Sequence, residues 1–507
     1  MASAQDVANR IPITAALILG TLLMSIDGTI ANVALPHMQG SFSASQEQTA
    51  WVLTSYIVAA AIMTPLSGWL ATRVGYRRVF LLSIAGFTIA SVLCGSATSL
   101  VQIVAFRFLQ GLCGAALQPL VQAVMLDLYA PSQIGQVLSI WGAASFLGPI
   151  IGPVLGGWLT DNLSWRWVFY INLPVGALSF AGVWLFMSRD RSNSARPFDF
   201  LGFGSLVVFV SALQLMLDRG STADWFASTE IRVEGVVAAI ALYVFVVHIL
   251  TATHPLFDRG LARDRNFMTA NLFSVVAGVM TFSTLALQPP LMQGLMGYSV
   301  LAAGVVMMPR GVASLISMLI VGRLVGRVDT RLLLTTGLVL VAVSMLQMSH
   351  FDLSMSSEPF ITSALVQGFG MGLIFVPMSS LGFATIAPRL RADGAIVYAL
   401  TRSLGQSVGI SAAEAILTNR MAAAHGDLAA QVQPGSPAAE AGLGAAMDPA
   451  NIGAFAGLNG EITRQASMIG YVDVFHLGLI ASLAMLPLVL LLRPPRAPST
   501  MTEVAVD

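Results

Sequence analysis

The sequence predicts an all-α membrane protein with fourteen transmembrane helices, arranged as two six-helix bundles plus two inserted helices. The chain of 507 residues is 56% hydrophobic and only 10% charged, whereas soluble domains carry about 25% charged residues. A water-soluble particle cannot hide so much apolar surface, so lipid must solvate much of it. In addition, apolar runs of about 20 residues, the length that spans a bilayer, recur along the whole chain.

Fourteen such runs occupy most of the chain. The first is not expected to be a cleaved signal peptide, because Asp27 interrupts it and no small-residue cleavage site follows it cleanly. The predicted helices are residues 14–36, 49–71, 79–98, 102–126, 135–160, 167–188, 200–218, 233–252, 267–291, 300–322, 331–350, 360–385, 395–420 and 473–492.

An even number of helices and an arginine-rich stretch near the middle indicate two bundles with an insertion between them. We predict an N-terminal six-helix bundle over residues 1–190, two inserted helices within 200–255, and a C-terminal six-helix bundle over 266–495. Segment 421–472 is rich in Ala, Gly, Gln and Pro. It is predicted to be a partly ordered loop on the outer side of the membrane, and a docking role for it stays open.

Arginine placement predicts the orientation in the membrane. All 25 basic residues are arginines. With the N-terminus inside, 17 of them fall in cytoplasmic segments and 5 in outer loops, while Arg107, Arg310 and Arg402 lie within predicted helices. Cytoplasmic loops of membrane proteins carry the excess of positive charge. Both termini are therefore predicted to lie in the cytoplasm.

Composition also excludes several functional classes. The chain has no lysine, which removes the nucleotide-binding lysine of ATP-driven motors and every Schiff-base lysine. No HExxH motif or nucleophile–base pair supports an enzyme, and the six histidines are scattered without metal-ligand spacing. The 25 acidic residues balance the basic ones, which gives no sign of a nucleic-acid partner. We predict no enzyme activity, no metal site and no cofactor.

The connection after the second predicted helix carries glycines and arginines that recur in the second half of the chain. They are Gly68, Arg73, Gly75, Arg77 and Arg78, and residues 322–329 repeat the pattern more weakly. Glycines let helix ends and a tight turn approach closely, and arginines bind helix C-termini and anionic lipid head groups. Two copies at matching places indicate a duplicated unit.

The fifth predicted helix is dense in small and helix-bending residues, namely Gly148, Pro149, Gly152, Pro153, Gly156 and Gly157. Gly148, Gly152 and Gly156 share one face, which lets another helix backbone come very close. The prolines remove backbone hydrogen bonds and predict a bend. A tightly packed helix without a special role is the alternative.

Predicted helix 102–126 has a polar or small stripe, made of Arg107, Gly111, Gly114, Gln118 and Gln122. An unpaired arginine in lipid costs about 2.5–3.5 kcal/mol on insertion scales. By the helical rise, Asp27 lies ~13 Å and Arg107 ~8 Å from the outer ends of their helices. A pair between them is therefore allowed, and a purely structural salt bridge is the alternative.

Other polar residues in the predicted helices are candidates for a binding cavity. Ser25, Thr29 and Asn32 lie opposite Asp27 on the first helix, and we expect one of these two faces to line a cavity and the other to pack on a neighbour. The candidate cavity residues are Asn32, Gln110, Gln118, Gln122, Gln288, Arg310 and Arg402. For those in the second half, and for Glu414, a satisfied packing role is equally open.

Several of these motifs together resemble a known family. The loop at 68–78, the stretch at 106–111 and the glycine- and proline-rich fifth helix are similar to the antiporter branch of the major facilitator superfamily. Ile26-Asp27-Gly-Thr29-Ile30-Ala-Asn32-Val-Ala-Leu-Pro36 resembles its fourteen-spanner drug/proton group. Three further stretches resemble the EmrB-type permeases. They are Trp165-Arg-Trp-Val-Phe169-Tyr-Ile-Asn172-Leu-Pro174-Val-Gly176, Met216-Leu-Asp218-Arg219-Gly220 and Asp224-Trp225-Phe226.

The resemblance covers almost the whole chain and implies export of drugs or other toxic amphipathic compounds against protons across a bacterial inner membrane. It also implies a periplasmic adaptor and an outer-membrane channel as partners. Asp27 and Arg107 would serve proton coupling, and the fifth helix would form the seam between bundles. Glu414 is a further candidate for proton coupling on its expected burial alone. Thr72 stands where the family loop commonly has an acidic residue, and Arg310 and Glu414 lie outside the family pattern.

Two other functions stay open at this point. A dedicated exporter of an endogenous metabolite, such as a lipid, siderophore or pigment, would have the same fold and the same energy source. A non-transporting receptor or scaffold is the alternative from a different class. Charged residues within at least three predicted helices argue against a scaffold, because burying charge in a membrane is costly and serves no purpose there.

Overall fold

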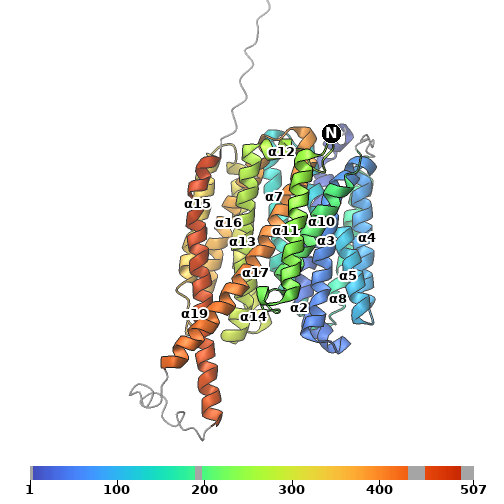
Figure 1. Cartoon of the computed structure of the whole chain (residues 1–507). Helices are drawn as coiled ribbons and strands as arrows, with labels where there is room; N and C mark the ends of the chain where they lie inside the picture. Colours follow the sequence, from blue (N-terminus) through green and yellow to red (C-terminus); the bar gives the residue numbers. More distant parts are fainter. Residues whose placement is uncertain (1–3, 189–196, 432–451, 493–507) are drawn as a thin grey trace, which may run out of the picture.

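The computed structural model describes residues 4–188, 197–431 and 452–492, and it is helical throughout (Figure 1). The predicted domain boundaries at 190 and 495 lie outside these ranges. The helices are α1 (Ala4–Ala8), α2 (Arg10–Phe42), α3 (Gln46–Val74), α4 (Tyr76–Ser96), α5 (Leu100–Gly114), α6 (Leu117–Leu128), α7 (Pro131–Asn162), α8 (Trp167–Tyr170), α9 (Asn172–Phe186), α10 (Phe200–Arg219), α11 (Thr229–Thr251), α12 (Gly260–Arg263), α13 (Arg265–Pro290), α14 (Val300–Leu324), α15 (Thr330–Met348), α16 (Glu358–Ala384), α17 (Arg391–Gln431) and α19 (Ile452–Ala484).

Fourteen helical segments correspond to the fourteen predicted ones. Within the described ranges, thirteen are long and apolar enough to cross a membrane. The remaining one, predicted at 395–420, is the middle of α17, whose Arg402 and Glu414 make it more polar than the others. The fold class read from the sequence is therefore confirmed.

Three predicted segments differ from the structure in detail. Segment 102–126 is interrupted at residues 115–116, between α5 and α6, and segment 167–188 is interrupted at Ile171, between α8 and α9. The loop predicted at 421–472 is wrong over most of its length. Residues 421–431 continue α17 and residues 452–472 begin α19, because alanine, abundant here, is the strongest helix former.

The outer parts of α17 and α19 form a pair that projects beyond the other helices (Figure 1). His425 lies 3.1 Å from the amide oxygen of Asn459, and Arg420 forms a 3.6 Å ion pair with Asp473. Residues 432–451 between the two helices lie outside the described residues. The pair is therefore a helical extension, not the partly ordered loop that composition alone suggested.

Helix packing follows the chain in two groups. In the first half, α2 packs on α7 and α9, α3 packs on α5, and α4 packs on α5 and α9. In the second half, α16 packs on α14 and α15, and α17 packs on α13 and α19. The two groups meet where α7 contacts α14 and α16 and where α17 contacts α3 and α6. The helices α10 and α11 pack on each other, and α10 also contacts α3 and α17.

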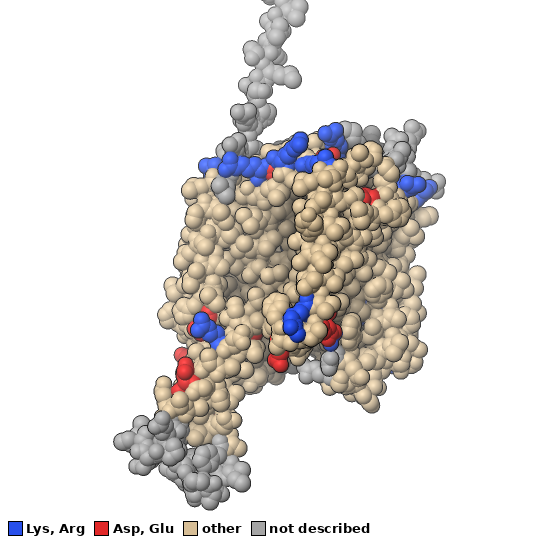
Figure 2. All heavy atoms as spheres, in the orientation of Figure 1, with Lys and Arg blue, Asp and Glu red and all other residues tan. Residues whose placement is uncertain are grey.

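Charge is concentrated at the two ends of the molecule. Figure 2 shows most of the visible arginines in a band at the end that holds the N-terminus, and a nearly uncharged flank below it. We call this end the arginine-rich face. Uncharged flanks are typical of surfaces in contact with lipid. That the arginine-rich face is cytoplasmic remains a prediction from the arginine asymmetry.

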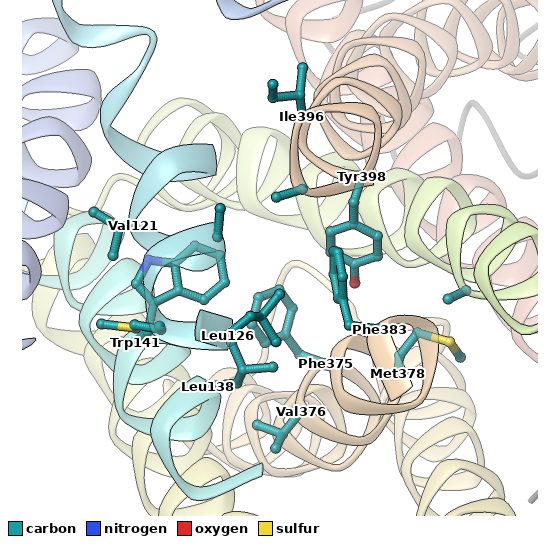
Figure 3. Packing of buried hydrophobic residues seen from close by; sticks show 14 of the residues in the cluster. Val121, Leu126, Leu138, Trp141, Phe375, Val376, Met378, Phe383, Ile396 and Tyr398 are labelled. Carbon is teal, nitrogen blue, oxygen red and sulfur yellow. The ribbon is translucent and has the colours of Figure 1, made fainter. Parts of the chain in front are cut away.

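Buried apolar residues join the two helix groups near the arginine-rich face. Trp141 of α7 and Phe375 of α16 face each other with ring centroids 6.0 Å apart, among buried residues of both groups (Figure 3). Toward the opposite face the apolar clusters are separate. One contains residues of α2 to α8 alone, and the other contains residues of the second half alone.

Candidate functional site

The core of the first helix group contains an ion pair with no solvent exposure. Asp27 of α2 and Arg107 of α5 are both 0% exposed. Arg107 Nη1 donates to Asp27 Oδ2 at 2.7 Å and lies 2.7 Å from Oε1 of Gln110. Gln110 Nε2 donates in turn to Asp27 Oδ1 at 2.9 Å. The contact that the helix depths allow is therefore present.

A second amide completes the surroundings of the carboxylate. Asn172 Nδ2, at the start of α9, donates to Asp27 Oδ1 at 2.7 Å and to Ser91 Oγ of α4 at 2.9 Å. Ser91 Oγ donates to the carbonyl oxygen of Phe169 at 2.8 Å. Asp27 thus receives hydrogen bonds from α5 and α9, and the network reaches α4 as well.

The guanidinium of Arg107 is held by α3 on its other side. Its Nε donates to the carbonyl oxygen of Val52 at 3.2 Å, and its Cζ lies 4.3 Å from the ring centroid of Tyr56. This reach depends on Gly111, one turn further along α5, because a Cβ there would overlap the backbone oxygen of Tyr56. Removing one partner of such a buried pair costs about 3–5 kcal/mol, since the other charge is left unpaired.

Sequence reasoning missed two members of this network. The sequence places Asn172 only within a family motif, and no sequence pattern marks Ser91 as a member of the network. The available signal was an amide and a hydroxyl inside otherwise apolar helices, since such groups need partners when buried. Their convergence on Asp27 depends on how α4 and α9 pack, which no local pattern reveals.

The glycine face of α7 packs on α2. A Cβ on Gly148 or Gly152 would overlap Ser25 or Thr29, and one on Gly156 would lie 2.8 Å from Cγ1 of Ile30. Ser25 Oγ donates to the carbonyl oxygen of Ser145 at 2.5 Å, and Thr29 Oγ1 donates to that of Gly148 at 3.0 Å. The face with Ser25 and Thr29 therefore packs on a neighbour. The Asp27 face is also buried, against α5 and α9, so the expectation that one of the two faces lines a cavity is not met in this structure.

The other members of the α7 motif contribute less to this contact. A Cβ on Gly157 would meet nothing within 4 Å, and Pro153 is half-buried. Pro149 lies within α7, but its side chain is outside the described residues. Asn32, at the end of the α2 face, is exposed.

Helix α7 also meets α14 of the second helix group, and glycines of both helices lie at this contact. Cβ atoms on Gly311 and Gly322 would overlap Ile150 and Ser139 of α7, and one on Gly304 would lie 3.3 Å from Cγ2 of Val154. The fifth predicted helix thus lies between the groups. Its own glycine face points to α2, however, and not to the other group.

The repeated loops have matching backbones and matching contacts. Gly75 joins α3 to α4 with φ 100°, and Gly326 follows α14 with φ 86°, a region that favours glycine. A Cβ on Gly68 would overlap Ile396 of α17, just as one on Gly322 would overlap Ser139 of α7. Each loop glycine therefore abuts the other helix group, as a duplicated unit requires.

The arginines of the first loop lie on aromatic rings. The guanidinium of Arg77 lies 5.0 Å from the ring centroid of Trp184, and its Nη2 donates to the Trp184 carbonyl oxygen at 2.7 Å. Arg73 lies 5.2 Å from the ring centroid of Trp69. The Arg77 contact joins α4 to α9 at the arginine-rich face, whereas the Arg73 contact lies within α3.

The predicted polar stripe 107–122 is divided between two environments. Arg107 and Gln110 point into the first helix group, whereas Gln118 Oε1 accepts a 2.8 Å hydrogen bond from Arg402 Nη2 of α17. Gln122 is 1% exposed. The stripe is not one face, because the helix is broken at residues 115–116.

Three candidates of the second half lie apart from the Asp27 network. Arg310 Nη2 donates to Gln288 Oε1 at 2.6 Å, and both residues are buried between α14 and α13. Glu414 is half-buried on α17, where Asp218 of α10 lies close enough for the two carboxylates to repel each other. Neither Arg310 nor Glu414 is bonded to Asp27 in the described part of the chain.

Comparison with known proteins agrees with these features. The family model described as Major Facilitator Superfamily matches residues 17–410. The chain is 34% identical over 496 residues to the multidrug export protein EmrB of Escherichia coli (strain K12), covering 96% of each chain. It is 33% identical over 489 residues to the fatty acid resistance protein FarB of Neisseria gonorrhoeae, covering 95% of this chain and 96% of FarB.

A solved structure shows the same fold. The human organic anion transporter MFSD10 (TETRAN) superposes with a TM-score of 0.60 at 14% identity, over 94% of this chain and 99% of that one. Identity at this level concerns the fold alone. The family match covers well over half of the sequence, and it contains the Asp27 network and the repeated loops. The chain therefore belongs to the Major Facilitator Superfamily and is a membrane transporter, not an enzyme.

Proposed function

We propose that this chain is a proton-coupled efflux antiporter, which exports drugs or other toxic amphipathic compounds across a bacterial inner membrane with both termini in the cytoplasm. The observation that carries the proposal is the Asp27–Arg107 pair, which is fully buried and bonded to amides of α5 and α9. A scaffold gains nothing from a desolvated carboxylate, whereas a proton carrier needs one. EmrB and FarB, named for multidrug export and fatty acid resistance, support an amphipathic substrate.

Alternating access supplies the mechanism. The helix groups share an apolar core near the arginine-rich face and have separate clusters at the other. Opening the shared core while closing the opposite side would expose a central site to each compartment in turn. Protonation of Asp27 would weaken its bond to Arg107 and so favour one of the two arrangements.

We further propose that the chain is the permease of a tripartite pump. The pair formed by the outer parts of α17 and α19 supports this, since it provides a folded surface beyond the membrane for a periplasmic adaptor. An outer-membrane channel would complete the path. The adaptor is tested by co-purification with the full chain and with a variant in which residues 425–459, at the projecting ends of α17 and α19, are replaced by a short glycine-serine linker.

Energy coupling is tested in everted vesicles with a panel of compounds and an imposed pH gradient. We expect an uncoupler to abolish export, and vanadate and ATP analogues to leave it unchanged, because the chain has no lysine for a nucleotide motor. ATP-dependent export by the purified protein in liposomes would contradict the proposal. Drug-susceptibility assays beside metabolite profiles separate it from a dedicated exporter of an endogenous metabolite.

A further inference from the structure

Arg310 is a buried cation without a counter-ion in the described part of the chain. It lies on α14 directly after Pro309 and is 8% exposed. Its Nη2 donates to Gln288 Oε1 at 2.6 Å, but its Nε and Nη1 have no hydrogen-bond partner among the residues that the structure describes. Within residues 4–188, 197–431 and 452–492, no carboxylate forms an ion pair with it. Burial of a guanidinium with unsatisfied N–H groups is unfavourable.

Arg107, the buried arginine of the first helix group, has a different environment. Arg107 is also buried, yet it has Asp27, the Gln110 amide and the Val52 carbonyl as acceptors. The second helix group offers Arg310 one neutral amide instead. A structural arginine would be expected to have a carboxylate beside it, as Arg107 does.

The groups around Arg310 suit an amphipathic molecule. Polar side chains lie next along the two neighbouring helices. Thr284 precedes Gln288 by one turn on α13, and Gln367 precedes Gly368, which meets the Arg310 backbone; both are buried, and Gln367 Nε2 donates to Thr284 Oγ1 at 3.1 Å. Toward the outer end, Met292, Met348 and Phe360 belong to the apolar cluster of the second half. Gln288 connects the two environments, because its Nε2 lies 3.6 Å from the sulfur of Met348. Methionine adapts its shape to different apolar partners.

A second arginine, Arg402 of α17, also lies beside α16 and has no carboxylate partner among the described residues. Arg402 contacts Gln118 at 2.8 Å and lies 5.8 Å from the ring centroid of Phe375 on α16. The backbone of Arg310 meets α16 at Gly368. Seven residues separate Gly368 from Phe375, which corresponds to about 10 Å of helix. The interior of the second half therefore carries positive charge at two levels.

We propose that Arg310 binds the carboxylate head group of an anionic amphipathic substrate, whose apolar body lies against the methionine-containing cluster. A carboxylate supplies both the negative charge and the acceptor oxygens that Nε and Nη1 lack within the protein. The proposal rests on the proposed export function and specifies its substrate class. A fatty acid and an acidic drug share this chemistry.

The test is equilibrium binding to the purified full chain in detergent, at about pH 8, where a carboxylic acid is ionised. The probes are decanoate and decanol, which share an apolar chain and differ in charge. We expect the wild type to prefer decanoate, Arg310→Gln to lose at least tenfold of that preference, and Arg310→Lys to keep part of it. Arg323→Gln is the matched control, because Arg323 lies exposed on the same helix.

The ratio of the affinities for decanoate and decanol distinguishes a loss of carboxylate binding from a loss of folding. Decanol binding that survives in Arg310→Gln shows an intact fold, so a loss confined to decanoate supports the proposal. Equal affinities for both probes in the wild type, or an unchanged preference in Arg310→Gln, would overturn it. So would displacement of decanoate by chloride alone, which would indicate a site for inorganic anions. Binding needs no gradient, so failure of proton coupling in vesicles would contradict the proposed function without affecting this result.

Discussion

Three side chains, Arg107, Gln110 and Asn172, donate hydrogen bonds to the carboxylate of Asp27, which has no exposed surface. While these contacts persist, water cannot reach the carboxylate. Under the proposed function, a proton would bind or leave only when the contacts of α2 with α5 and α9 open. Protonation of Asp27 would then be coupled to helix packing, as the proposed antiport requires.

Asp27→Asn is expected to insert and to bind substrate but not to accumulate it against a gradient. Asparagine keeps the shape and some hydrogen bonds but cannot release a proton, and it leaves Arg107 unpaired, at a cost in stability of about 3–5 kcal/mol. Asp27→Glu should keep partial activity with a shifted pH optimum, since a titrating group remains. Proton release on substrate binding in detergent measures the difference.

A structural role for Asp27 predicts another outcome, in which both substitutions mainly lower expression. Proton release by Asp27→Asn equal to that of the wild type would show that Asp27 is not the coupling residue. Glu414→Gln is the companion variant, because Glu414 would then be the next candidate. It is half-buried on α17, outside the Asp27 network.

At the scale of helices, sequence patterns predicted which face of a helix packs closely better than they predicted which helix packs against that face. The spacing of Gly148, Gly152 and Gly156 predicted a close helix contact, and the structure shows it. The partner is α2 and not the other helix group, which spacing alone cannot tell. Likewise, the similar depths of Asp27 and Arg107 along their helices allowed the pair to be predicted. Asn172 joins the Asp27 network only through the tertiary packing of α9, which the sequence does not reveal.

Two errors of the sequence reading have local causes. The stripe through Gln118 and Gln122 assumed a continuous helix, but the turn at residues 115–116 directs Gln118 toward Arg402. Segment 421–472 is polar enough to resemble a loop, yet helix formation depends on propensity as well as on hydrophobicity. Helix pairing by His425 and Asn459 could not be seen in either segment alone.

Gly152→Leu should reduce transport while the protein still inserts. A larger side chain would overlap Thr29, and overpacking of this kind costs about 1–3 kcal/mol. Gly157→Leu is the matched control on the same helix, since a Cβ there meets nothing within 4 Å. Export and expression of both variants are compared in everted vesicles. Wild-type export by Gly152→Leu would show that close contact between α7 and α2 is not needed.

Across the whole molecule, the two helix groups share a buried apolar core at one face but not at the other. Near the arginine-rich face, Trp141 and Phe375 belong to one shared core, and Gly68 and Gly322 bring α3 and α14 against the opposite groups. At the other face the apolar clusters remain separate. The proposed export by alternating access, with the arginine-rich face in the cytoplasm, requires the shared core to separate so that substrate can enter.

This requirement can be tested with a removable cross-link between α7 and α14. A Cβ on Gly135 would lie 3.0 Å from Cβ of Val325, close to the roughly 3.5–4.5 Å found in disulfides. In a background without Cys94 and Cys113, Gly135→Cys with Val325→Cys should transport when reduced. Oxidation should abolish export, and dithiothreitol should restore it, because the disulfide holds the arginine-rich face closed.

The control is a cross-link between helices that are packed in the same half of the chain. Ala270 of α13 and Gly382 of α16 suit this purpose, since a Cβ on Gly382 would lie 2.7 Å from that of Ala270. Oxidation of this pair should leave export largely intact, because helices of one group move together. Export that continues with the α7–α14 disulfide fully formed would show that the two groups do not separate at this face. Equal inhibition by both pairs would indicate general damage instead.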